Sequence, residues 1–321
     1  MDSRSSFEPG GRPRLGISAC LAGERVRFDA GHKRDRFLIG SLGPFVTWVS
    51  VCPEVEAGFG VPRPALRLVR DSGICLVETG SGRNRTGEMS AYLAERIERL
   101  ADDRLSGFVL KKGSPSCGLE RVKVYGESGI PDRTGQGLFA AALVDRFPQL
   151  PVEEEGRLCD PDLRESFVER VFAYHRLQVM FASRWAVRDL VSFHEAHKLL
   201  LLAHDPIAYG RLGRIVANPR SVDRSTLQHA YSVEFTGALA RPATRRRHAN
   251  VLEHMLGYFK RALDDESRVE LVSIVRRFAA GLLPLAAPLA LLAHHIRRCG
   301  VKYLAGQVYL NPYPEGLMLR A

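Results

Sequence analysis

The sequence predicts an α/β domain with a mostly parallel, Rossmann-like sheet, followed by an all-α helical bundle. Short apolar strands alternate with helical segments between Arg14 and Glu154, which is typical of a parallel sheet. Beyond Asp162 the apolar residues recur at helical spacing only. A chain of 321 residues can bury two cores. We therefore expect a disordered N-terminus at residues 1–13, an α/β domain at 14–158 and an all-α domain at 159–321.

Local patterns define the elements of the first domain. Apolar runs predict buried strands, and apolar residues three or four apart predict a helix. The turn at Asp71-Ser72-Gly73 predicts a hairpin. Gly135-Gln136-Gly137 opens a helix, and its glycines match a phosphate-binding loop only in part. We expect strands that begin near Leu15, Trp48 and Phe108, a hairpin over 66–77, a helix over 88–103 and a last strand over 150–154.

The second domain is predicted to consist of helices separated by proline, glycine and polar breaks. Asp205-Pro206 is expected to end one of them, because proline interrupts a helix interior. No internal repeat is visible. The expected helices cover 163–176, 186–203, 224–239, 244–263, 267–283 and 288–298.

Three cysteines stand at the ends of predicted strands. Cys20 follows the first strand, and Cys52 ends the second and precedes a proline. Cys117 lies in a turn of Gly, Ser and Pro after the strand at Phe108. Because α/β sheets place ligand sites at the carboxyl ends of their strands, we expect these cysteines to converge on one site.

The other cysteines favour plain burial or surface positions. The segment Met1 to Ser6 lacks the apolar stretch of a secretory signal, and no run is long and apolar enough to span a bilayer. We therefore expect a cytoplasmic protein without membrane contact, in which six cysteines are not a disulfide scaffold. Cys75 lies in an apolar run, Cys159 in a linker and Cys299 near a helix end.

Cys20, Cys52 and Cys117 allow three interpretations. Simple burial suits any one of them, but three at strand-end turns make it the poorer account. Zinc would require a fourth protein ligand or an open catalytic position. A cubane iron–sulfur cluster is held by thiolates, and three of them leave one iron without a protein ligand. Such an iron is a soft Lewis acid suited to a sulfur-bearing substrate.

Two side chains stand close to these cysteines along the chain. Glu54 lies two residues after Cys52, and Ser114 lies three residues before Cys117, so both are candidates for proton transfer. Each also has a structural alternative. Glu54 could pair with Arg63, which a glycine- and proline-rich loop presents beside the site, and Ser114 could cap the turn.

The positive charge is concentrated in the second half of the chain. From Cys159 onward, 23 Lys and Arg face 15 Asp and Glu, a net charge of +8 that leaves +2 for residues 1–158. This bias favours a polyanionic partner, although a basic cluster more often forms only a solvated face. The aromatic residues there could stack on bases or fill the core. The candidates for nucleic-acid contact are Arg241, Arg245, Arg246, Arg247, Lys260 and Arg261, with Tyr209, Tyr231 and Tyr258 as stacking candidates.

The histidines of the second half favour a structural role over a metal site. His194 and His197 are three residues apart, whereas the zinc-protease motif spaces them by four. No cysteine or carboxylate at ligand spacing accompanies them. Polar histidines that line a bundle or an RNA-binding face remain the alternative.

At this point the motifs resemble known families. The segments 17–21, 52–54, 60–63 and 111–118 resemble the thiouracil desulfidase family, TudS-like, over about Arg14 to Glu154. The segments 193–198, 250–254 and 257–260 are similar to the YbgA-type helical domain. The fusion of the two is similar to bacterial enzymes that remove sulfur from 4-thiouridine in tRNA.

The resemblance implies a 4Fe-4S cluster on Cys20, Cys52 and Cys117, with one iron free of protein ligands. By the family's mechanism, this iron takes the thiocarbonyl sulfur, water attacks the carbon, and uridine and sulfide form without net redox change. Glu54 and Ser114 match the proposed proton-transfer residues of the family. The helical domain would bind tRNA, and Arg63 would contact the substrate. One departure is Asn84-Arg85-Thr86, where the family has Asp-Val-Thr.

Two other functions remain open. The protein could be a desulfidase of free thiouracil-type bases, with the helical domain as a scaffold. It could also be a non-catalytic RNA-binding or redox-sensing protein that uses its cluster structurally. Activity on tRNA, compared with activity on the free base, separates these alternatives.

Overall fold

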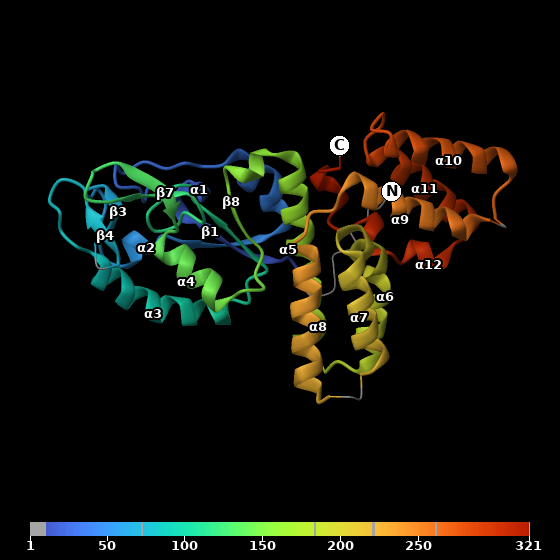
Figure 1. Ribbon diagram of the computed structural model, residues 1–321, viewed down its shortest axis with the longest axis horizontal. Helices are drawn as coiled ribbons and strands as arrows, with labels where there is room; N and C mark the ends of the chain where they lie inside the picture. Colours follow the sequence, from blue (N-terminus) through green and yellow to red (C-terminus); the bar gives the residue numbers. More distant parts are fainter. Residues whose placement is uncertain (1–10, 72, 183, 220–221, 261, 321) are drawn as a thin grey trace. The chain divides into compact units, whose positions relative to one another are not determined.

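The chain divides into two compact units, Met1–Phe167 and Val168–Ala321, and the division falls inside one helix (Figure 1). The computed structural model describes residues 11–71, 73–182, 184–219, 222–260 and 262–320. Residues 1–10, most of the segment expected to be disordered, lie outside these ranges. The first unit combines strands with helices and the second is built of helices, so the predicted fold class is confirmed.

Four parallel strands form the first sheet, in the order β2-β1-β5-β8. In the register, Leu15 pairs with Trp48 on one side and with Gly107 on the other. The three strands that precede the cysteines are therefore direct neighbours. Apolar side chains of β1 and β5 are buried on both faces, which explains their continuous hydrophobic runs. The strand bounds are Arg14–Ser18 (β1), Thr47–Val51 (β2), Gly107–Leu110 (β5) and Val152–Glu154 (β8).

A second, mixed sheet has the order β4-β3-β6-β7. The hairpin predicted over 66–77 is confirmed, since β3 (Leu66–Arg70) and β4 (Ile74–Glu78) pair antiparallel. Strands β6 (Val122–Tyr125) and β7 (Pro131–Gly135) were not predicted. The reason is visible in β7, whose polar side chains are mostly exposed and carry no apolar pattern.

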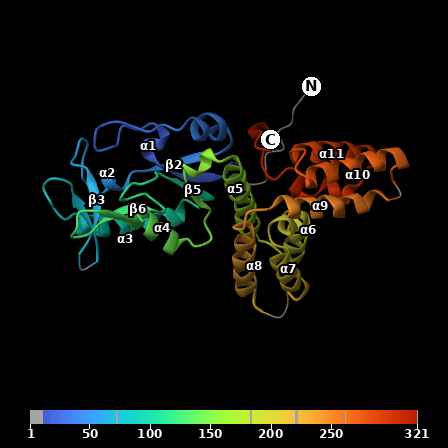
Figure 2. The ribbon, with the colours of Figure 1, turned by 45° about the horizontal axis from the view of Figure 1, so that its top comes forward.

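The helices of the first unit lie on both sides of the parallel sheet. Helices α3 (Thr86–Asp102) and α4 (Leu138–Arg146) pack side by side on one face, as Figures 1 and 2 show. The helix predicted over 88–103 is thus confirmed, and its apolar face is buried. Short helical segments follow three of the strands. Between β1 and β2 lie α1 (Ala19–Ala22), a π-helical turn at Phe37–Leu42 and a 3₁₀ turn at Gly43–Phe45, whereas α2 (Pro53–Glu56) follows β2 and a 3₁₀ turn at Arg157–Cys159 follows β8.

The helices that build the second unit, the first of which begins at Pro161 in the first unit, bury their apolar faces in one core. They include a helix that the sequence did not predict, α7, which begins directly at Pro206. Proline is well accommodated at the first helical position, and the Asp205 carboxylate accepts the amides of Ile207 and Ala208 at 3.0 and 3.2 Å. The bounds are Pro161–Ala182 (α5), Val187–His204 (α6), Pro206–Ala217 (α7), Arg224–Leu239 (α8), Arg245–Leu256 (α9), Asp265–Ala279 (α10) and Ala286–Cys299 (α11), followed by Lys302–Ala305 (α12) and 3₁₀ turns at Gly257–Phe259, Val308–Leu310 and Glu315–Leu317.

The helical core is aromatic and aliphatic. Tyr231, Phe235 and Phe259 are almost fully buried in it, together with leucines of α6 and α9. Tyr231 therefore packs in the core, while Tyr258 is 40% exposed. Among the described residues, none of these helices combines the length and apolar character that crossing a membrane requires.

Candidate functional site

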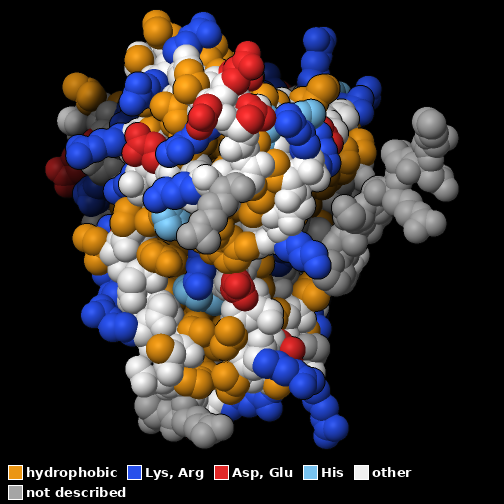
Figure 3. Space-filling view, turned by 90° about the vertical axis from the view of Figure 1, so that its right-hand side faces the viewer, with side chains coloured by type: hydrophobic (Ala, Val, Ile, Leu, Met, Phe, Trp, Pro, Cys, Tyr) orange, Lys and Arg blue, Asp and Glu red, His pale blue; other side chains and the backbone are white. Residues whose placement is uncertain are grey.

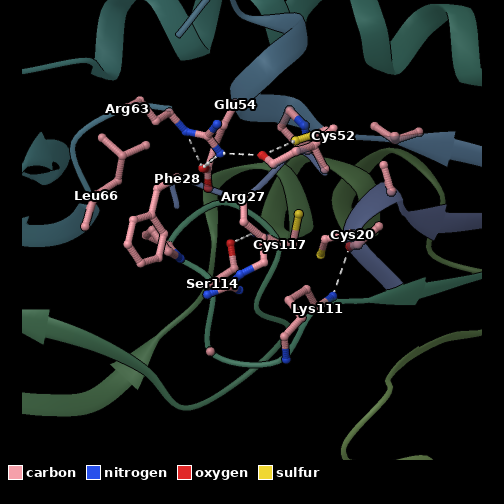
Figure 4. A pocket seen from close by; sticks show the side chains of 18 of the residues that line it. Cys20, Arg27, Phe28, Cys52, Glu54, Arg63, Leu66, Lys111, Ser114 and Cys117 are labelled. Carbon is pink, nitrogen blue, oxygen red and sulfur yellow. Dashed lines mark hydrogen bonds and ion pairs between the residues drawn. The ribbon is translucent and has the colours of Figure 1, made fainter. Parts of the chain in front are cut away.

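The structure brings the three strand-end cysteines to one cavity. Cys20 lies in α1, which follows β1 directly, and Cys52 precedes α2 at the end of β2. Cys117 lies in the loop after β5. All three side chains line a cavity of about 270 Å³ at the carboxyl edge of the parallel sheet, where Figure 4 shows their sulfur atoms facing the same space. The order of the parallel strands thus brings three cysteines that are distant in the sequence to the same cavity.

Burial keeps these three thiols protonated when no metal is bound. Burial, with a contribution from neighbouring Cys52, raises the pKa of Cys20 to about 11. The pKa of Cys52 is raised mainly by burial, and that of Cys117 is raised further because the thiol is fully enclosed and faces Glu54 and both other cysteines. Binding a metal centre here must therefore release protons, since thiolates are the ligands.

The donor set fits a multi-iron cluster. All three cysteines are free of disulfides. Among the described residues, no three His, Cys, Asp or Glu side chains converge tightly enough to hold a single metal ion. A cubane cluster differs from such a site because each thiolate binds a different iron, so its ligands stand further apart. Cys20, Cys52 and Cys117 would be the residues that hold it.

Glu54 is held in place by two partners. The Arg63 guanidinium donates to Oε2, with the Nε–Oε2 distance at 3.0 Å, and the Ser116 hydroxyl donates to Oε1 at 2.9 Å. Arg63 also donates to the carbonyls of Gly60 and Val26, at 2.7 and 3.0 Å. The side chain of Arg63 is only 4% exposed, so it supports the carboxylate and does not reach solvent. The structural alternative, a Glu54–Arg63 pair, is thus present, and Glu54 still lines the cavity.

Ser114 caps its turn and also faces the cavity. Its Oγ accepts the backbone amides of Ser116 and Cys117, at 3.2 and 3.1 Å. Within the described residues its O–H donates no hydrogen bond. Because this side chain lines the cavity, its hydrogen can be donated to a bound molecule (Figure 4). Capping and proton donation are therefore compatible at this residue.

Two serines at the site were not singled out from the sequence. Ser18 accepts the backbone amide of Lys111 at 2.9 Å, and its hydroxyl bonds to the sulfur of Cys117. Ser116 orients Glu54, although 62 residues separate them. Both serines lie next to or near a site cysteine in the sequence, but their partners are distant along the chain. Only the fold reveals these contacts.

The glycines before α4 serve close packing and do not form a phosphate loop. A Cβ atom on Gly137 would lie 2.5 Å from the carbonyl carbon and oxygen of Ser116. The amides of Gly137, Leu138 and Phe139 donate to carbonyls of the Cys117 loop, at 2.8, 3.2 and 2.9 Å. These donors are consequently not available to an anion, and the start of α4 fixes the loop that carries Cys117.

Comparisons with known proteins identify the family. A family model described as 2-thiouracil desulfurase matches residues 15–155, the part that contains the whole cavity. Residues 15–155 belong to the 2-thiouracil desulfurase family. A second model, DUF1722, a family of unknown function, matches residues 198–314. The chain therefore joins a desulfurase region to a YbgA-type helical region, as its motifs suggested.

Individual relatives each match about half of this chain or less, and most of their own length. The YbgA protein of Escherichia coli is 31% identical over 157 residues, which are 49% of this chain and 93% of that protein. YbbK of Bacillus subtilis is 29% identical over 133 residues, 40% of this chain and 87% of that protein. A solved structure, the 4Fe-4S-dependent thiouracil desulfidase TudS, is 30% identical, with 49% of this chain and 100% of that chain covered and a TM-score of 0.39.

The departure from the family motif at Asn84-Arg85-Thr86 is accommodated within the desulfurase region. Arg85 pairs with Glu78 at 2.6 Å and with Glu88 at 3.0 Å. Its side chain is 17% exposed and lies over the ring of Phe59. The added positive charge is therefore neutralised locally and is not presented to a phosphate.

The basic residues of the YbgA-type region divide into two groups. Arg245 donates to the carbonyls of Phe278 and Leu283, and Arg247 donates to the carbonyl of His204, so both hold the ends of neighbouring helices. Arg241 pairs with buried Asp205 at 2.8 Å. Arg246 and Lys260 are exposed, and Arg261 lies outside the described residues. In Figure 3, Lys and Arg are spread over the visible face among apolar and acidic side chains, not gathered in one patch.

The histidines of this region are mostly structural. His194 bonds to the hydroxyl of Tyr231 at 3.2 Å, and His197 bonds to the carbonyl of Phe193 at 2.7 Å. Burial, with Lys198 nearby, lowers the pKa of His194 to about 4. Burial also lowers the pKa of His197, which is fully enclosed. Neutral, hydrogen-bonded imidazoles in a helical core account for this motif without a metal.

Proposed function

We propose that the protein is an iron–sulfur-dependent desulfidase that removes the sulfur of 4-thiouridine in tRNA. The observation that carries this proposal is one cavity lined by three free thiols, Glu54 and Ser114 in a chain of the 2-thiouracil desulfurase family. Cys20, Cys52 and Cys117 would hold the cluster. When bound, such a cluster supplies an iron without a protein ligand, a soft Lewis acid suited to sulfur.

The residues of the cavity can carry out a hydrolysis without redox change. Water oxygen forms a bond to the ring carbon, the carbon–sulfur bond breaks, and the two water protons leave with the sulfide. Glu54, oriented by Arg63 and Ser116, takes the proton from the attacking water. Ser114 donates its free hydrogen to the substrate. The products are uridine and hydrogen sulfide, so neither electrons nor an oxidant are required.

The helical region would hold the RNA. Its net charge favours a polyanion, and Arg246 and Lys260 are exposed, as are Arg241 and Arg245, which also bond to Asp205 and to backbone carbonyls. Tyr258, which is 40% exposed, stacks on Tyr303 with ring centroids 4.9 Å apart. An exposed tyrosine face beside lysines is suited to unpaired bases.

The deciding experiment compares substrates after anaerobic cluster reconstitution. We expect about four irons per chain, and loss of the 4-thiouridine absorbance of tRNA with release of one sulfide per thiouridine. Cys117→Ala should abolish both the cluster and the activity, whereas Cys75→Ala, in strand β4, should change neither. Reconstituted protein that leaves the absorbance of thiolated tRNA unchanged would contradict the proposal.

A second candidate is a desulfidase of free thiolated bases, which the name of the similar TudS structure favours. The same preparation separates the two, because this candidate predicts faster turnover of 2-thiouracil than of tRNA. A cluster that is present but inactive on both substrates would indicate the non-catalytic RNA-binding or redox-sensing alternative.

A further inference from the structure

An exposed phenylalanine lines the cavity opposite the thiols. Phe28 is 41% exposed, and every other described phenylalanine is at least partly buried. Its side chain belongs to the cavity wall together with that of Leu66. In Figure 4 these two lie on one side of the cavity, and Cys20, Cys52 and Cys117 lie on the other. An apolar ring left open to solvent beside reactive groups indicates a surface for a ligand.

The loop that carries Phe28 is fixed to the catalytic residues. The backbone amide of Arg63 donates to the carbonyl of Phe28 at 3.0 Å, and the Arg63 side chain donates to Val26. Beyond Phe28, the amide of Ala30 donates to the carbonyl of Arg27 at 3.0 Å. Ala30 has a φ of 56°, a left-handed conformation that costs about 1 kcal/mol outside glycine. A strained, well-bonded turn therefore presents the ring in a preformed position.

The cavity has an apolar side and a side lined by thiols. This arrangement favours one orientation of a bound planar ring. Phe28 and Leu66 lie on the side of the cavity away from Cys20 and Cys52, and Glu54 and Ser114 lie between them and the thiols (Figure 4). The Arg27 guanidinium lies 5.3 Å from the centre of the Phe28 ring and adds a positive charge at this wall. A heteroaromatic ring packed on Phe28 would direct its exocyclic sulfur toward the cysteines.

We propose that Phe28 is the residue on which the pyrimidine ring of the thiolated substrate stacks. This inference rests on the proposed desulfidase function and names the contact that positions its substrate. Stacking on an aromatic ring tolerates different bases, because every base has a π face. Phe28 therefore sets affinity for the ring, while the chemistry remains with Glu54 and Ser114. The loss of such a stack weakens binding by about 5- to 100-fold.

The test measures binding and turnover with reconstituted full-length protein. Uridine, which cannot react, serves as the binding probe by calorimetry, and 4-thiouridine serves as the substrate. We expect Phe28→Ala and Phe28→Leu to raise the Kd for uridine and the KM for the thiolated nucleoside by about 5- to 100-fold, with kcat and iron content unchanged. Phe28→Trp should bind as well as the wild type. Ile130→Ala, which removes an apolar side chain that is 76% exposed and lies outside the cavity wall, is the matched control.

The Phe28→Leu variant distinguishes stacking on an aromatic ring from contact with any apolar side chain. It keeps apolar area but has no ring, so uridine binding by Phe28→Leu at wild-type strength would overturn stacking. Wild-type protein that binds no uridine would overturn it as well. If the wild type binds uridine but desulfurates nothing, the proposed function fails, and the difference between Phe28→Leu and Phe28→Trp still tests the stacking contact.

Discussion

At the scale of single residues, one arginine, Arg63, connects several parts of the site. Arg63 holds the Glu54 carboxylate, the Gly60 carbonyl and two carbonyls of the loop that carries Phe28. Its planar guanidinium serves the Glu54 carboxylate and the carbonyls of Gly60 and Val26 together, which a lysine cannot do, while the Phe28 carbonyl accepts from the Arg63 backbone amide. Arg63 therefore links Glu54, the proposed proton-transfer group, to the loop that carries Phe28.

Removing this guanidinium should destabilise the protein strongly. Arg63→Met leaves Glu54, which is 16% exposed, without its charged partner, and we expect a loss of about 3 kcal/mol in the free energy of unfolding. Arg70→Met is the matched control, since the Arg70–Asp132 pair is exposed on both sides and should contribute less than about 1 kcal/mol. Urea unfolding of both variants measures the difference. Equal losses would show that Arg63 is an ordinary surface partner.

Some residues of the site could be predicted from the sequence and others could not. The difference is how far along the chain their partners lie. Cys20, Cys52, Cys117, Glu54 and Ser114 stand in short motifs at strand ends, so local pattern was sufficient to select them. The contacts of Ser18 with Lys111 and of Ser116 with Glu54 join segments 93 and 62 residues apart. No local pattern encodes such pairs. They depend on the strand order β2-β1-β5, which brings the three loops together.

At the scale of elements, strand ends and helix starts position the site. The order of the parallel sheet aligns the ends of three strands, and the first turn of α4 binds the Cys117 loop through backbone hydrogen bonds. Two of the elements that prediction missed have a visible reason: β7 has no apolar pattern, and α7 begins with proline. In both cases the surrounding structure, not local propensity, decides the conformation.

The packing of α4 predicts that alanine substitution at two different glycines changes the free energy of unfolding in opposite directions. In Gly137→Ala the new methyl group would lie 2.5 Å from Ser116 backbone atoms, so the Cys117 loop must shift. We expect a loss of about 1–3 kcal/mol in unfolding free energy and less iron bound after reconstitution. In Gly87→Ala, within α3, the added Cβ meets nothing within 4 Å, and we expect a gain of about 0.5–1 kcal/mol.

Unfolding curves and iron content, measured on the same preparations, check both glycine variants. If Gly137→Ala bound iron and unfolded like the wild type, the contact between α4 and the Cys117 loop would not be required for the site. The Gly87 variant shows whether adding a methyl group in this unit is harmful in itself.

At the scale of the whole molecule, the net charge does not show that the basic residues have different contacts. The helical region carries most of the excess, but Arg245 and Arg247 donate to backbone carbonyls and Arg241 pairs with Asp205. A count of charges could predict a polyanionic partner for this region. It could not distinguish arginines that bond to helix ends or to Asp205 from exposed side chains such as Arg246 and Lys260, because that distinction depends on tertiary contacts.

This difference predicts how the proposed binding of tRNA depends on salt. Each cation that contacts a phosphate releases counterions, so log K falls with log salt concentration, and losing one contact lowers the slope by about 1. The double variant Arg246→Gln, Lys260→Gln should therefore weaken binding of tRNA and lower the slope by about 2, with unchanged stability. Arg247→Gln should instead lower the unfolding temperature, because its bond to the His204 carbonyl at 2.6 Å is lost. Binding titrations from low to high salt, with thermal unfolding of the same samples, separate these effects. A slope that is unchanged in the double variant would move the RNA-binding surface away from α9 and the turn that follows it.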